Sequence, residues 1–358
     1  MNSVKKVNYP WLDLMRYVAA LLVVLGHFRA DFFVNYDQLP ASQHGGITQI
    51  IYVLTSLGHS SVLIFFVLSG YLVGGGILDK LKSGSFNALS YSIDRATRIQ
   101  LPLLSALFLI AISNAVMGVS APLSHYVLNF ISLQGIACHS LAGPLWSLAY
   151  EVWFYVIAGS TASIITTKRT KDKFLSFIWL TVSMIVLSQL SVTYSFLWFL
   201  GALASQVKIR EFNMFAMVTA SVGMAAFALL NLHNVASRLS ITTDSLAADV
   251  ITICFGLSAC LFIVNIIHIT PKARFACWLD SFGTKMAKFS YTLYLTHWSV
   301  LLLMLHFGVN KASSIQVHSV AIYLLGIILA HIVAFALYLP FESQSYRLKK
   351  WVKNRMLQ

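Results

Sequence analysis

RYVAALLVVLGH, residues 16–27, is the first long apolar stretch of the chain, and it carries a cation at one end and an imidazole at the other. The ten residues between Arg16 and His27 are uncharged. Such a run is typical of a helix inside a lipid bilayer, where charged and titratable side chains are rare and usually functional. The stretch therefore predicts a membrane helix whose two polar residues do more than pack.

The composition extends this interpretation to the whole chain. Of its 358 residues, 58% are hydrophobic and 10% are charged, and the mean hydropathy is +0.75. Soluble domains contain about 25% charged residues. We therefore expect an all-α, polytopic integral membrane protein in which residues 1–358 form a single membrane domain. The formal charge of +13 does not indicate nucleic-acid binding, because the basic residues fall in short clusters between apolar runs.

Ten apolar segments are long enough to be membrane spans when about 20 residues are allowed for each crossing. Residues 174–207 are too long for one crossing and predict two crossings or a re-entrant hairpin. The expected spans are 11–33, 59–78, 99–119, 146–166, 174–190, 193–207, 213–231, 246–267, 289–306 and 318–340.

Basic residues fall on alternate connections between these spans. One set consists of Lys5, Lys6, Lys80, Lys82, Arg95, Arg98, Lys168, Arg169, Lys171, Lys173, Lys208, Arg210, Lys272, Arg274, Lys285, Lys288 and the segment from Arg347 to Arg355. The opposite set contains only Arg29, Arg238 and Lys311. Lys and Arg accumulate in cytoplasmic loops. We therefore expect both termini in the cytoplasm and a basic cytoplasmic tail over residues 341–358.

Two further signals are absent from the sequence. No small-residue cleavage site follows the first apolar run, so we expect this run to stay in the membrane as a signal anchor. The cysteines have no spacing that indicates a zinc site or a disulfide framework, and no metal is expected. They are Cys138, Cys254, Cys260 and Cys277.

Arg16 and His27 are eleven residues apart, which is about three helical turns, so they share one face and are separated by about 16 Å along the axis. With the N-terminus inside, Arg16 lies toward the cytoplasm and His27 toward the outer leaflet. The simpler alternative is that Arg16 pairs with Asp13 and that His27 is a hydrogen-bonded packing residue.

The fourth span begins GPLWSLAYEVWFY, residues 143–155, with one glutamate among aromatic residues. Counted from the outer surface, Glu151 lies near the depth of His27. A carboxylate beside a histidine fixes its tautomer and raises its basicity. The alternative is that Glu151 forms hydrogen bonds only for assembly of the helices.

The third span is entered through SIDRATRIQLP, residues 92–102. Arg95 and Arg98 are three residues apart and project from one helix face, and arginine forks suit phosphate recognition. Together with Arg16 and Asp13 they predict a binding site for an anionic cytoplasmic ligand. The alternative is an ordinary positive-inside anchor.

Two other spans carry polar or small residues. FFVLSGYLVGGG, residues 65–76, contains Ser69, Gly70 and Gly74, which permit close approach of a helix or a ligand. FSYTLYLTHW, residues 289–298, places His297 near the middle of the membrane. An ionisable group there indicates a functional site.

These stretches occur in an order that resembles the membrane-bound acyltransferase-3 family, the bacterial integral-membrane O-acetyltransferases of polysaccharides. The resemblance rests on LDLMRYVAALLVVLGH, FFVLSGYLVG, DRATRI, LWSLAYEVWFY and FSYTLYLTHW. It covers spans one to four and nine. The chain departs from the family pattern at Leu14 or Met15, where a glycine is usual, at Val152, where a second acidic residue is usual, and at Pro102, which lies farther from Arg98 than usual.

The resemblance implies transfer of an acyl group, usually acetyl, from acetyl-CoA to a hydroxyl of a glycan or lipid-linked glycan such as lipopolysaccharide. Acyl-CoA is then a substrate, and no bound cofactor is expected. The family also implies a multi-pass protein of the bacterial inner membrane. We expect His27 and Glu151 to be catalytic, and the substrates to be bound by Arg16, Asp13, Arg95, Arg98, Ser69, Tyr71, Trp146 and His297.

Two other classes of function remain open from the sequence. A transporter or flippase of a glycan-lipid or another anionic substrate would line its path with the same polar residues. Such proteins are commonly built from inverted repeats, and no internal repeat is visible here. A scaffold subunit of a polysaccharide assembly complex is the third possibility.

Overall fold

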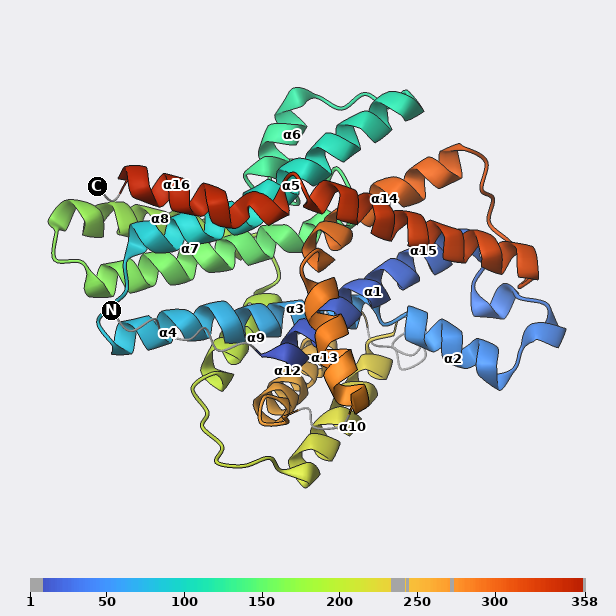
Figure 1. The fold of residues 1–358 in the computed structure, drawn as a ribbon, viewed down its shortest axis with the longest axis horizontal. Helices are drawn as coiled ribbons and strands as arrows, with labels where there is room; N and C mark the ends of the chain where they lie inside the picture. Colours follow the sequence, from blue (N-terminus) through green and yellow to red (C-terminus); the bar gives the residue numbers. More distant parts are fainter. Residues whose placement is uncertain (1–8, 233–241, 243–244, 271–273, 357–358) are drawn as a thin grey trace.

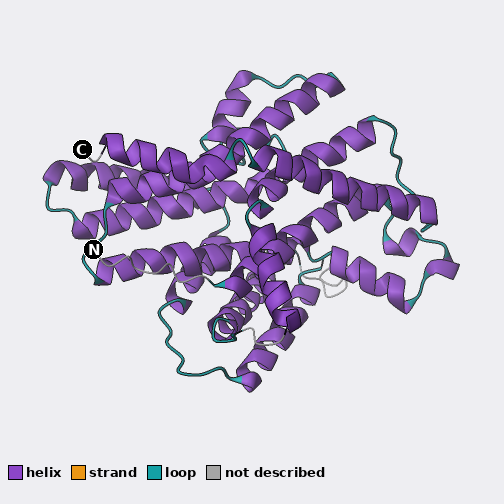
Figure 2. Cartoon of the chain, in the orientation of Figure 1, coloured by secondary structure: helices purple, strands orange, loops and turns teal. Residues whose placement is uncertain are grey.

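The computed structural model describes residues 9–232, 242, 245–270 and 274–356. Four of the basic residues used to predict the topology, Lys5, Lys6, Arg238 and Lys272, lie outside these ranges. The described residues form helices and contain no strand beyond two isolated bridges. The prediction of an all-α protein is confirmed (Figure 2).

Each of the ten apolar segments contains helix. The helices are α1 (Pro10–Phe32), α3 (Gly58–Ser69) continuing through the π-helical turn η3 (Gly70–Gly74) into α4 (Gly75–Lys82), α5 (Ala88–Met117), α7 (Trp146–Thr166), α8 (Thr170–Ser188), α9 (Val192–Ala204), α10 (Met214–Leu230), α12 (Leu246–Ile266), α14 (Ser290–His306) and α15 (Val317–Tyr338). Residues 174–207, which are too long for one crossing, are divided between α8 and α9.

Six helical segments among the described residues are long and apolar enough to cross a membrane. These are Pro10–Phe32, Gly58–Lys82, Ala88–Met117, Gly143–Thr166, Leu246–Ile266 and Val317–Met356. The protein therefore has the helices of a multi-pass membrane protein. The number of ten crossings and the cytoplasmic position of both termini stay predictions.

Shorter helices complete the part of the chain that the structure describes. They are α2 (Gly46–Thr55), α6 (Leu123–Phe130), α13 (Arg274–Ala287) and α16 (Ser345–Met356), with the 3-10 turns η1 (Tyr36–Gln38), η2 (Ala41–Gln43), η4 (Gly143–Leu145) and η5 (Glu342–Gln344).

Helix α1 lies at the centre of the molecule (Figure 1). It packs against α3, α13 and α14 and also touches α2 and α15. Helix α5 packs against α7, α14 and α16, while α9 packs against α3 and η3. Because α1 contacts so many neighbours, its polar residues meet side chains from distant parts of the sequence.

The two ends of the molecule differ in charge. The end of α4, the turn between α7 and α8, and the end of α16 lie at one end in Figure 1, where these segments carry many of the lysines and arginines. Helix α2 and the connection from α14 to α15 lie at the opposite end. We call the basic end the inner end and the end with α2 the outer end.

The C-terminal segment, predicted as a basic tail, is a helix docked on α5. In α16, the Nζ atoms of Lys349 and Lys353 lie 2.9 and 2.8 Å from Oδ1 of Asp94. The Lys353 ammonium also donates to Ser90 Oγ at 2.5 Å. These contacts place α16 beside the predicted DRATR segment of α5.

Glycine lets the second span approach α9 closely, as the sequence predicts. A Cβ added to Gly70 would meet the backbone carbonyl of Trp198, and one added to Gly201 would meet that of Val67. The added Cβ of Gly74 would lie 2.5 Å from that of Ala202. The π-helical turn, a feature frequent at functional sites, thus lies in direct backbone contact with α9.

We expect Gly70→Ala to destabilise the protein by about 1–3 kcal/mol or more, because a backbone carbonyl cannot give way as a flexible side chain can. Gly76→Ala is the matched control, since nothing lies within 4 Å of a Cβ at that position. Thermal unfolding of both variants in detergent checks the prediction. Equal midpoints would show that η3 and α9 do not depend on this approach.

Candidate active site

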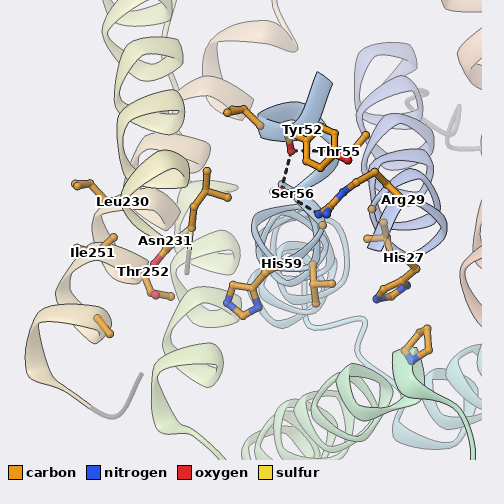
Figure 3. Close-up of a pocket in the computed structure, with 18 of the residues that line it drawn as sticks. His27, Arg29, Tyr52, Thr55, Ser56, His59, Leu230, Asn231, Ile251 and Thr252 are labelled. Carbon is orange, nitrogen blue, oxygen red and sulfur yellow. Dashed lines mark hydrogen bonds between the residues drawn. The ribbon is translucent and has the colours of Figure 1, made fainter. Parts of the chain in front are cut away.

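A cavity of about 1320 Å³ opens among the outer ends of the helices. Its lining includes Val23, Gly26, His27, Arg29, Tyr52, His59, Trp146, Tyr194, Asp249 and Tyr294. In Figure 3, His27 and Arg29 extend from α1, with Leu230 and Thr252 among the lining residues drawn across from them. The volume exceeds the about 300–1,000 Å³ of ordinary small-molecule sites. A ligand larger than one sugar unit therefore fits.

His27 is hydrogen-bonded to a second histidine from the ninth expected span. Its Nδ1 lies 2.9 Å from Nε2 of His297, and the two rings are nearly parallel, with an interplanar angle of 9°. The His297 side chain is fully buried, whereas His27 is half-buried and lines the cavity. The structure therefore brings together two residues that are 270 positions apart in the chain.

The partners of this pair fix the positions of its protons when both rings are neutral. Nδ1 of His297 lies 3.1 Å from the carbonyl oxygen of Leu293, and a carbonyl only accepts, so this nitrogen carries the proton. Nε2 of His297 is then an acceptor and takes the hydrogen bond from Nδ1–H of His27. Nε2 of His27 consequently has a free lone pair and is the atom available to take a proton.

Glu151 has different partners from those the sequence suggests. Its Oε1 accepts a hydrogen bond of 2.5 Å from the hydroxyl of Tyr155. That hydroxyl lies 2.9 Å from Ser69 Oγ, which accepts from Nε1 of Trp198 at 3.0 Å. Because an indole donates and a carboxylate accepts, the chain runs in one direction, from Trp198 through Ser69 and Tyr155 to Glu151.

The Glu151 carboxylate lies within electrostatic range of three arginines, Arg95, Arg98 and Arg16. The Arg95 guanidinium lies 5.6 Å from the centre of the Tyr155 ring. The described residues show no hydrogen bond between Glu151 and His27, so the pairing suggested by the sequence is not seen. The glutamate lies near the inner arginines and also interacts electrostatically with Tyr294, which lines the outer cavity.

An irregular segment precedes α7 and is packed inside the protein. Ser132 and Gln134 are buried, Gln134 donates to the carbonyl of Leu145 at 2.8 Å, and Trp153 Nε1 donates to that of Ser132 at 2.9 Å. The chain thus passes into the protein before α7 begins.

The inner cluster contains all the basic residues predicted to bind an anionic ligand. Arg16 NH1 lies 2.7 Å from Asp13 Oδ1, which is the ion pair that the simpler alternative for this arginine predicts. Arg98 NH1 lies 3.3 Å from Oε1 of Glu342, whose other oxygen accepts from the Thr292 hydroxyl at 2.6 Å. Among the ion pairs of the described residues, Arg95 has none.

Two groups in this cluster that belong to no ion pair are buried without a hydrogen-bond partner among the described residues. They are Nε of Arg95 and the hydroxyl of Tyr291. Tyr291 interacts electrostatically with Glu151, Glu342 and Arg98. Buried polar groups are normally hydrogen-bonded, so these two are available to a ligand that enters from the inner side.

The remaining predicted residues divide between the two parts of the site. Trp146 lines the outer cavity and stacks on His59 with ring centres 6.3 Å apart. Ser69 belongs to the hydrogen-bonded chain on the inner side. Tyr71 is buried in the hydrophobic core, and it interacts electrostatically with Asp79.

Several residues of the site are missed by the sequence argument. Tyr155 could be found from the helical spacing, because it lies one turn after Glu151 and so on the same face of the helix. Glu342 is an acidic residue directly after the last apolar run. Arg29, Tyr291 and Trp198 have no pattern that separates them from ordinary lining or core residues.

Comparison with known proteins supports an assignment for the whole chain. The family model described as an acyltransferase domain matches residues 9–339. Comparisons with curated proteins and with solved structures gave no match. The matched region contains α1 to α15, and with them His27, His297, Glu151 and the inner arginines. The chain belongs to the membrane acyltransferase-3 family.

Proposed function

We propose that this acyltransferase moves an acyl group, expected to be acetyl, from cytoplasmic acyl-CoA to a hydroxyl of an extracytoplasmic or lipid-linked glycan. We place it in the bacterial inner membrane. The observation that carries the proposal is the free Nε2 of His27, a residue that lines a large outer cavity, together with the arginines near the inner end.

In the proposed step, His27 Nε2 takes the proton of the acceptor hydroxyl as its oxygen attacks the thioester carbonyl. The carbon–sulfur bond breaks, the acyl group stays on the acceptor oxygen, and CoA leaves as the thiolate. The proton held by His27 then passes to the sulfur. His297 is a positioning residue, because its Nε2 holds Nδ1–H of His27 and keeps Nε2 of that ring unprotonated.

The donor is assigned to the inner cluster. CoA is a multiply anionic molecule, and arginine forks form strong charge-assisted bonds with phosphate. Arg95 has an unpartnered Nε and no ion pair among the described residues, whereas Arg16 and Arg98 already neutralise Asp13 and Glu342. Arg95 is therefore the arginine most available to the donor.

We expect Arg95→Gln to weaken acyl-CoA binding by about 1–3 kcal/mol, which is the loss of charge-assisted hydrogen bonds. Arg98→Gln has the smaller effect, because Arg98 must leave Glu342 before it binds a phosphate. Equilibrium binding of acetyl-CoA to the purified variants measures both. Arg169→Gln is the control, since this exposed arginine lies on the turn before α8. Unchanged affinity for Arg95→Gln would return this residue to the role of a topological anchor.

The acceptor is assigned to the outer cavity. Trp146, Tyr52 and Tyr194 supply aromatic surface, while Thr252 and Asp249 supply polar groups. Such a mixture of apolar walls and a few polar groups is typical of sites for organic ligands. The lining residues come from several helices. Such a lining suits a ligand with several units, such as an oligosaccharide.

Release of CoA from acetyl-CoA by the purified protein tests the activity without knowledge of the acceptor. We expect slow release by water alone and faster release when glycan mixtures are added, and neither with His27→Ala. A protein that only transports would bind its cargo and leave the thioester intact. Absence of thioester cleavage under every condition would overturn the proposal.

A further inference from the structure

Arg29 is a cation of the outer cavity that the proposed step does not use. It follows His27 by two residues on α1, and both side chains line the cavity (Figure 3). The outer connections of the chain carry few cations, so a cation inside this cavity is unusual for its surroundings.

The contacts of Arg29 leave most of its hydrogen-bonding capacity unused. One terminal nitrogen donates to Ser56 Oγ at 3.2 Å, and the guanidinium lies 5.0 Å from the centre of the Tyr52 ring. Its Nε is buried and has no partner among the described residues. A guanidinium has five N–H donors, so a ligand in the cavity has several left to bind.

The charge of Arg29 is also uncompensated at close range. It takes part in none of the ion pairs found among the described residues, and Asp31 interacts with it only at longer range. Arg29 lies in the last turn of α1, where a cation is favoured by the helix dipole. Its side-chain hydrogen bond goes to Ser56, however, so the guanidinium points across to the segment after α2 and into the cavity.

We propose that the acceptor glycan carries an anionic group, a carboxylate or a phosphate, and that Arg29 binds it. This inference rests on the proposed function, because it places the acceptor in the outer cavity. An arginine fork binds either group through two parallel hydrogen bonds. Arg29 would thereby hold one part of an acidic oligosaccharide while a hydroxyl of the same molecule lies at His27.

Binding to an array of neutral glucose oligosaccharides and uronic-acid oligosaccharides of equal length tests the proposal. We expect the wild-type protein in detergent to bind the acidic set about ten- to hundredfold more tightly, with a preference that falls as salt is added. In Arg29→Gln the ratio of the affinities for acidic and neutral oligosaccharides should fall to near one. The ratio for Arg29→Lys should lie between those of Arg29→Gln and the wild type. Lys311→Gln, which removes an exposed outer cation that does not line the cavity, should keep the wild-type ratio.

Two results would overturn the inference. One is equal binding of acidic and neutral glycans by the wild type. The other is an equal loss of both in Arg29→Gln, which would show a structural role for this residue.

A second arm distinguishes the acceptor from the donor as the source of the anion. CoA release is measured from acetyl-CoA and from succinyl-CoA, whose acyl group ends in a carboxylate. We expect the ratio of the two rates to be the same in wild type and Arg29→Gln. A selective loss with succinyl-CoA would place the anion on the acyl group and overturn the acceptor assignment. Absence of CoA release from both donors, with the acidic-glycan preference intact, would contradict the proposed function and leave the Arg29 site standing.

Discussion

His27→Ala is expected to lower the rate of acyl transfer by about 10²–10⁴-fold, the usual contribution of a positioned general base. The affinity for acyl-CoA should change little, because the inner cluster that we assign to the donor contains Arg95, Arg98 and Arg16 and not this histidine. Single-turnover transfer and equilibrium binding of acetyl-CoA, measured on the same preparation, separate the two effects.

Two further variants keep this prediction specific. His27→Asn retains a side-chain N–H that reaches toward His297 but cannot take a proton, so it should be as inactive as His27→Ala while remaining better folded. His306→Ala removes an exposed histidine at the end of α14 and should leave the rate of acyl transfer unchanged. Substantial transfer by His27→Asn would show that this residue positions the substrate without acting as a base.

Glu151→Gln is expected to have the second largest effect, on stability and on donor use together. The change alters a carboxyl group that accepts from Tyr155 and interacts electrostatically with nearby arginines. Losing a hydrogen bond to a buried charged group costs about 1.5–3 kcal/mol, and Arg95, which has no ion pair among the described residues, loses a nearby acidic group. We expect a lower unfolding midpoint and a raised KM for acyl-CoA.

Comparison with Tyr155→Phe and His297→Gln shows which part of the site Glu151 serves. Tyr155→Phe keeps the ring below Arg95 and removes the hydroxyl that joins Ser69 to Glu151, so it should resemble a mild form of Glu151→Gln. His297→Gln should instead lower kcat and change its dependence on pH. If Glu151→Gln altered the pH dependence of kcat in the same way as His297→Gln, Glu151 would act through His27, against the geometry described here.

Much of the fold could be predicted from the sequence because lipid imposes simple rules. Each long apolar run must satisfy its backbone hydrogen bonds internally, and a helix does so. The close approach of the second span to its neighbour follows from Gly70 and Gly74, since only glycine permits it there. The docking of α16 could not be predicted, because a short basic helix after the last span looks the same whether it is free or paired with Asp94.

The sequence indicates candidate residues for the site but not how they pair. Helical periodicity shows that Arg16 and His27 share a face, but it contains no information about which other helix lies opposite. The pairing of His27 with His297 and of Arg98 with Glu342 depends on packing between segments more than 200 residues apart. The contact from Glu151 through Tyr155 to Ser69 joins α7 to the second span, and helical periodicity does not show this contact either.

The central claim is that donor and acceptor reach the site from opposite ends of the protein. The most direct measurement uses sealed proteoliposomes in which the orientation of the protein is known, with radiolabelled acetyl-CoA outside and oligosaccharides trapped inside. The account predicts labelled glycan in the lumen only for protein whose arginine-containing end faces the external acetyl-CoA. Label on glycan only when both substrates are supplied on the arginine side would contradict it.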